Sequence, residues 1–141
     1  MARPGAGGER QDETANESPL VAVVDDDASV RKSTRRLIQS FGYRAEAFAS
    51  GEEFLGSPLA AQTACLVVDV RMPDMDGLEV QRQIAARDLR IPVIFITGRA
   101  SDEEERRARA AGAVDVLRKP IATATLLHVL RKILSKGDGQ S

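Results

Sequence analysis

The chain has very little of several residue types that common functions need. Its 141 residues include one cysteine, one histidine and no tryptophan, and aromatic residues make up only 4%. One cysteine cannot form a disulfide framework, and Cys65 lies inside an apolar run, so we expect it to be a small core residue. The scarcity of aromatic side chains predicts a core built from aliphatic residues.

The sequence also lacks an excess of either charge and any long apolar run. The sequence has 20 Lys and Arg against 21 Asp and Glu, for a net charge of −1. It therefore has no excess of positive charge with which to bind nucleic acid. No apolar stretch approaches the ~20 residues of a membrane span, and no apolar segment of a secretory signal follows Arg3. We therefore expect a soluble cytoplasmic protein that binds neither nucleic acid nor membrane.

The length and the 43% hydrophobic content predict one domain with a proper core. Residues 1–18 are rich in Gly, Glu, Ala and polar residues, which predicts a disordered tail. Residues 136–141 have a similar composition and are predicted to form a flexible C-terminal tail. The domain itself is then expected over residues 19–135.

Within this domain, short apolar runs alternate with helical patterns. The alternation predicts an α/β fold, a doubly wound five-stranded parallel sheet of the flavodoxin-like order 2-1-3-4-5 with helices on both faces. Strands are predicted at 20–24, 43–48, 65–68, 91–96 and 114–117, and helices at 29–41, 50–55, 78–86, 102–111 and 123–134.

Acidic residues end the two strands that flank the switch point of such a sheet. Asp25 and Asp26 follow the first strand, and Asp69 ends the third. Neighbouring parallel strands lie ~4.8 Å apart, so these carboxylates would crowd one crevice and repel each other unless a cation joined them. Oxygen ligands in a shallow site suit Mg²⁺, and a carboxylate there can act as the nucleophile that forms an aspartyl-phosphate.

Two other strand ends carry groups that suit phosphoryl transfer. Thr97 offers a hydroxyl donor, Gly98 leaves room beside it, and Lys119 offers a compact cation for a phosphoryl oxygen. Each is ordinary at a strand end when taken alone, but together they complete a plausible transfer site. We assign Asp27 to solvent or to the start of the next helix, where an acid favours the helix dipole.

The segments VAVVDDD, LVVDVRMPDMDG, VIFITG and VDVLRKP resemble the receiver domain of two-component response regulators, nearest to the FixJ-type transcriptional regulators. The resemblance covers about residues 19–135. It implies that Asp69 accepts a phosphoryl group from a sensor histidine kinase and that the domain signals by a conformational change. It also implies that Asp25, Asp26 and Asp69 hold Mg²⁺ together with the backbone carbonyl of Arg71.

The same resemblance assigns roles to the ends of the last two strands. Thr97 becomes the switch hydroxyl, and Lys119 becomes the phosphate-binding lysine, joined to Pro120 by a cis peptide. Similar receivers usually carry Tyr or Phe where Val116 stands, and that aromatic ring rotates inward when the switch threonine engages the phosphoryl group. This departure puts in question how phosphorylation is coupled to the surface formed by the fourth helix, the fifth strand and the fifth helix. The resemblance implies that this surface mediates self-association or binds a downstream protein.

Two arginines are expected to control how long the phosphorylated state lasts. Arg71 and Arg99 lie two residues past the acceptor and two past the switch threonine, where the resemblance puts the approach of the hydrolytic water. Their guanidinium groups can fork onto phosphoryl oxygens, so we expect shielding and slow decay of the phosphoform. In the alternative both side chains simply extend into solvent.

Two other functions compete with this interpretation. The first is a Mg²⁺-dependent phosphatase that forms an aspartyl-phosphate, but it needs a second carboxylate where Arg71 stands and a cap over its substrate. The second is a receiver-like interaction module that works without phosphorylation, which only Val116 favours. The chain is expected to catalyse its own phosphorylation and dephosphorylation rather than to act on a separate substrate.

The charged segment 102–109 is expected to be a solvated helix face. Its acids and bases recur at i,i+4 spacing with the acid first, as in Glu105 and Arg109, an arrangement that stabilises an exposed helix.

Overall fold

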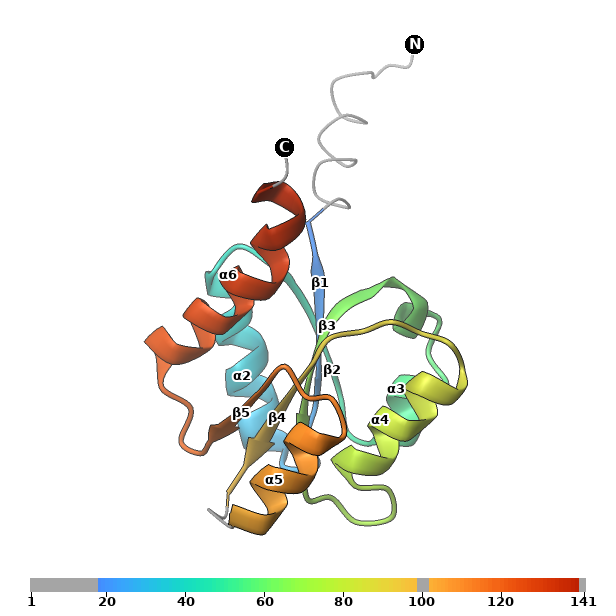
Figure 1. The fold of residues 1–141 in the computed structure, drawn as a ribbon. Coiled ribbons are helices and arrows are strands. Elements are labelled where there is room, and N and C mark those ends of the chain that lie inside the picture. The colour runs from blue at the N-terminus through green and yellow to red at the C-terminus, as the bar shows by residue number, and fades with distance from the viewer. Residues whose placement is uncertain (1–17, 99–101, 140–141) are drawn as a thin grey trace.

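Five parallel strands form a single sheet. The computed structural model describes residues 18–98 and 102–139, and all of its strand pairs are parallel in the order β2-β1-β3-β4-β5 (Figure 1). The predicted order is therefore confirmed. The strands are β1 Leu20–Val24, β2 Arg44–Phe48, β3 Thr63–Asp69, β4 Val93–Thr97 and β5 Asp115–Arg118.

Helices cover both faces of the sheet. Two of them, α2 and α6, lie on one face, and α3, α4 and α5 lie on the other (Figure 1). Chain reversal between parallel strands requires such crossover helices, which is why the alternating pattern predicted them. The helices are α2 Ala28–Ser40, α3 Gly51–Leu55, α4 Gly77–Ala86, α5 Asp102–Ala110 and α6 Thr123–Gly139.

The core has two halves because successive strand residues point to opposite faces of the sheet. Val67 packs in the half that contains Ile38 of α2 and Leu126 of α6. Val68 packs in the opposite half, which contains Ile84 of α4. Burial on both faces explains why the central strands are continuous apolar runs rather than alternating ones.

The fold differs from the prediction in one additional helix, in the end of α6 and in several strand boundaries, such as that of β4, which begins at Val93 rather than at 91. A 3₁₀ helix, η1 at Pro58–Gln62, precedes β3. The sequence does contain a signal for the start of this helix, since Ser57 is its N-cap and Pro58 occupies its first turn. The helix α6 extends to Gly139 rather than 134. The last turn of α6 therefore overlaps the segment 136–141, for which the sequence predicts a flexible tail.

Several expectations concern the ends and the surface of the chain. Residues 1–17 and 140–141 lie outside the described residues, so most of the predicted N-terminal tail does too.

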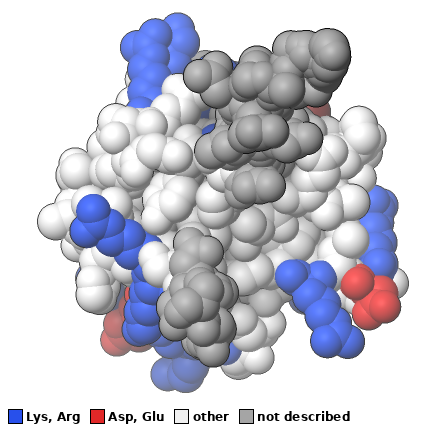
Figure 2. Space-filling model, turned by 90° about the horizontal axis from the view of Figure 1, so that it is seen from above, with Lys and Arg blue, Asp and Glu red and all other residues white. Residues whose placement is uncertain are grey.

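Across the described ranges, no helix combines the length and hydropathy needed to cross a bilayer. Seen from above, Lys and Arg side chains stand apart around the rim rather than in one patch (Figure 2).

Candidate functional site

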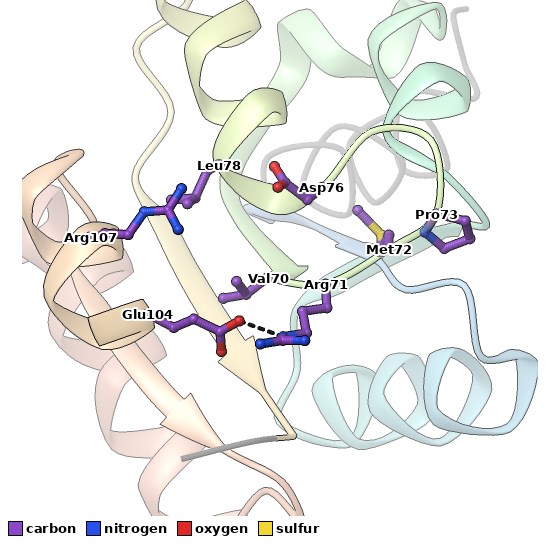
Figure 3. A pocket seen from close by; sticks show the side chains of 8 residues that line it. All are labelled: Val70, Arg71, Met72, Pro73, Asp76, Leu78, Glu104 and Arg107. Atoms are coloured by element: carbon purple, nitrogen blue, oxygen red, sulfur yellow. Dashed lines mark hydrogen bonds and ion pairs between the residues drawn. The ribbon is translucent and has the colours of Figure 1, made fainter. Parts of the chain in front are cut away.

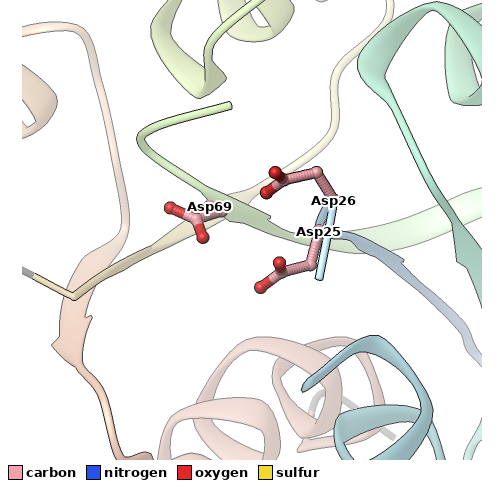
Figure 4. Close-up of side chains that lie close together, drawn as sticks. All are labelled: Asp25, Asp26 and Asp69. Carbon is pink, nitrogen blue, oxygen red and sulfur yellow. The ribbon is translucent and has the colours of Figure 1, made fainter. Parts of the chain in front are cut away.

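Three acidic side chains meet at the carboxyl ends of β1 and β3 (Figure 4). Asp25, Asp26 and Asp69 each place a carboxylate oxygen within 4.8 Å of the others. Asp25 and Asp69 are buried, whereas Asp26 is exposed. The grouping follows from topology, since β1 and β3 are hydrogen-bonded neighbours and both end at this edge of the sheet.

A lysine at the end of β5, two strands away from β3, contacts two of these acids. Lys119 Nζ lies 2.6 Å from Asp69 Oδ2 and 3.2 Å from Asp25 Oδ2. Its backbone is fixed at the end of β5, where its N–H donates to the Thr97 carbonyl over 2.8 Å, and its peptide bond to Pro120 is cis as expected. Burial lowers the pKa of Lys119, but the hydrogen bond and charge of Asp69, followed by those of Asp25, outweigh burial and raise it. The lysine is therefore a cation at neutral pH.

The three acids carry more negative charge than Lys119 can balance. Burial raises the pKa of Asp25, a hydrogen bond from the Asp27 N–H opposes this, and the charge of Asp69 raises it further. One ammonium group cannot balance three carboxylates, and all three carboxylates offer only oxygen donors. Such a set suits a small divalent cation such as Mg²⁺. Asp25, Asp26 and Asp69 are the residues that could hold it.

The loop after β3 is held by backbone hydrogen bonds. The Arg71 N–H donates to Asp69 Oδ1 over 2.9 Å, and the Val70 N–H donates to the Ile96 carbonyl over 2.9 Å. The Gly77 N–H donates a hydrogen bond to the Val70 carbonyl over 2.9 Å, and Asp76 is the N-cap of α4. These contacts fix the Asp69 carboxylate at the carboxyl edge of the sheet.

Comparison with known proteins identifies the family. Residues 21–131 match the family model of the response regulator receiver domain. The chain belongs to this family. Nodulation protein W of Bradyrhizobium diazoefficiens is 42% identical over 116 residues, which cover 82% of this chain and 51% of that protein. Response regulator protein TmoT of Ectopseudomonas mendocina is 39% identical over 125 residues, covering 89% and 57%. The chain thus spans about half the length of these curated relatives.

Solved receiver structures share the fold. The FixJ-N crystal structure superposes with a TM-score of 0.75 at 33% identity, covering 83% of this chain and 94% of that one. The chemotaxis protein CheY4 of Vibrio cholerae gives a TM-score of 0.76 at 31% identity, covering 83% and 99%. The predicted resemblance to receiver domains is confirmed by the family model, and the likeness to the FixJ type is confirmed by the FixJ-N structure.

The remaining predicted residues of this receiver occupy different environments. Thr97 is buried at the end of β4, one position beyond the residue that pairs with Asp69. Val116 is buried in the core half that contains Ala108 of α5. Arg99 lies outside the described residues. Asp27 caps α2 by accepting hydrogen bonds from two backbone N–H groups, as expected for a residue at the start of that helix.

One contact at the site was missed by the sequence analysis. Nε of Arg71 donates to Oε2 of Glu104 in an ion pair between the loop after β3 and α5 (Figure 3). The pair borders a hollow of about 500 Å³. The pattern of α5 did predict the Glu105–Arg109 pair, which forms at 3.1 Å. Nothing in the sequence signals the Arg71–Glu104 pair, because its residues are 33 positions apart.

Proposed function

We propose that Asp69 is the phosphoacceptor of this receiver and that Asp25 and Asp26 join it in holding Mg²⁺. The observation that carries the proposal is the contact of 2.6 Å between Lys119 Nζ and Asp69 Oδ2, beside two further carboxylates. A buried acid in close contact with a cation, beside two further carboxylates that could hold a metal ion, has the parts that phosphoryl transfer needs.

The donor we propose is the phosphohistidine of a sensor kinase. An oxygen of Asp69 forms a bond to phosphorus as the P–N bond breaks, and the electron pair of that bond returns to the histidine nitrogen. Mg²⁺, when bound, supplies positive charge for the phosphoryl oxygens. Lys119 supplies a second positive charge and already contacts the acceptor, while Thr97 offers a hydroxyl on the next strand.

We also propose where the protein works and how its phosphorylated form passes on the signal. A kinase donor fits the predicted cytoplasmic location. We place signalling, by self-association or a downstream protein, on the face of α5, β5 and α6. Val116 of β5 is too small to act as the aromatic rotor of similar receivers, so this coupling must use other contacts. Arg71 stands where an aspartyl-phosphate phosphatase needs its second carboxylate, which disfavours that alternative.

Intact-mass measurement with a small phosphodonor and Mg²⁺ tests the proposal. The protein should gain one phosphoryl mass, and EDTA or Asp69→Asn should abolish the gain. Asp76→Asn is the matched control, because it removes a carboxylate from the same loop but keeps a good helix cap. A phosphoryl mass that persists in Asp69→Asn would contradict the assignment.

A further inference from the structure

Arg71 has two contacts that link the acceptor to α5. Its backbone N–H donates to Asp69 Oδ1 over 2.9 Å, while its guanidinium pairs with Glu104 on α5 (Figure 3). The Glu104 side chain is 13% exposed and the Arg71 side chain is 60% exposed. The carboxylate is therefore the fixed member of the pair, and the arginine is the member free to move.

The guanidinium has a second potential partner once Asp69 carries a phosphoryl group. Phosphoryl oxygens are strong acceptors for an arginine fork, and the new negative charge would arise on the side chain that the Arg71 backbone already touches. Glu104 draws the guanidinium toward α5 instead, so the two anions compete for one cation.

We propose that Glu104 is a positioning residue that holds the Arg71 guanidinium on α5, away from the phosphoryl group, and so shortens the lifetime of the phosphoform. The inference rests on the proposed role of Asp69. Hydrolysis forms a bond from water to phosphorus, breaks the bond to Asp69, returns its electron pair to the carboxylate and passes the water proton to solvent. A guanidinium on the phosphoryl oxygens obstructs that water, whereas one on Glu104 leaves the approach open. The proposal therefore replaces the shielding by Arg71 that the sequence led us to expect, because the structure pairs this guanidinium with Glu104.

The decay of the phosphoform tests this competition. The protein is phosphorylated with a small phosphodonor and Mg²⁺, the donor is removed, and the phosphoryl mass is followed over time. Glu104→Gln should slow the decay roughly two- to five-fold, which corresponds to the strength of an ion pair with one solvent-exposed partner. Arg71→Ala removes only the side chain and keeps the backbone carbonyl, and adding Glu104→Gln to Arg71→Ala should not change the decay of that variant further.

A neighbouring acid provides the matched control. Glu103 is exposed on the same helix, so Glu103→Gln removes the same charge without touching the pair and should leave the decay unchanged. Equal or faster decay in Glu104→Gln would overturn the inference, as would slowing that persists without Arg71. Glu104→Ala should act in the same direction as Glu104→Gln. A wild-type protein that never gains the phosphoryl mass would instead contradict the role of Asp69.

Discussion

Two adjacent aspartates at the end of β1 have different tasks. Asp26 contributes an oxygen to the acidic cluster, while Asp27 turns away and caps α2 by accepting from the N–H groups of Ser29 and Val30. A single residue step along the chain therefore separates a candidate metal ligand from a helix cap. Identical side chains make these two positions a direct test of the site.

Asp26→Asn should lose Mg²⁺ affinity yet melt at the same temperature as the wild type, or higher, in EDTA. Removing one charge relieves repulsion with Asp25 and Asp69 when no metal is present. Asp27→Ala should do the reverse, keeping Mg²⁺ affinity while losing about 0.5–2 kcal/mol of stability with its cap. Calorimetric Mg²⁺ titration and thermal melting measure both. A clearly lower melting temperature for Asp26→Asn would mean that the acids are structural.

At the scale of elements, the loop between β3 and α4 depends on close backbone approach. A Cβ built on Gly77 would lie 2.5 Å from the Asp69 carbonyl oxygen and 3.0 Å from Cε1 of Phe95. Both neighbours belong to central strands and cannot easily yield. The first residue of α4 thus packs directly against β3, which fixes the loop that carries Arg71.

Gly77→Ala should therefore destabilise the protein by about 1–3 kcal/mol, as overpacking does. The clash outweighs the gain in helix propensity, which is at most about 1 kcal/mol. Gly98→Ala is the control at the end of β4, since its nearest atom would be Cδ of Lys119 at 3.8 Å. Denaturant unfolding compares the two variants. Equal stability of Gly77→Ala and the wild type would show that the loop can shift.

At the scale of the whole molecule, the two core halves enclose the sheet from both sides. Cys65 of β3 is fully buried in the half covered by α2 and α6. Burial also raises the pKa of its thiol to about 12. Access to this sulfur requires the helical layer to separate from the central strand, which disrupts the fold as a whole.

The single thiol should thus report global unfolding. A thiol reagent should label Cys65 very slowly in native buffer, and the labelling rate should rise with denaturant in step with unfolding. Protein fully unfolded in denaturant should label completely, which serves as the control. Rapid labelling under native conditions would show that this half of the core opens locally.

The sequence by itself determined the sheet and the edge of the sheet at which the candidate site lies. Apolar runs and helical patterns specify parallel strands, and parallel strands bring their carboxyl ends to one edge. Asp25, Asp69 and Lys119 could therefore be grouped from their places at strand ends, before any distance was known. The boundaries of the elements are not set by one residue, as the extension of α6 to Gly139 shows, because helix ends depend on cooperative hydrogen bonding.

Only the tertiary structure decided which side chains meet. Lys119 could be assigned to the site from sequence, but its simultaneous contact with Asp69 and Asp25 depends on the register of β5 beside β4. The pairing of Arg71 with Glu104 depends on how α5 packs over the loop after β3. Periodicity within a helix predicts neighbours three or four residues apart, as for Glu105 and Arg109. It carries no information about a partner on another element, because that contact is set by the packing of the two elements against a shared core.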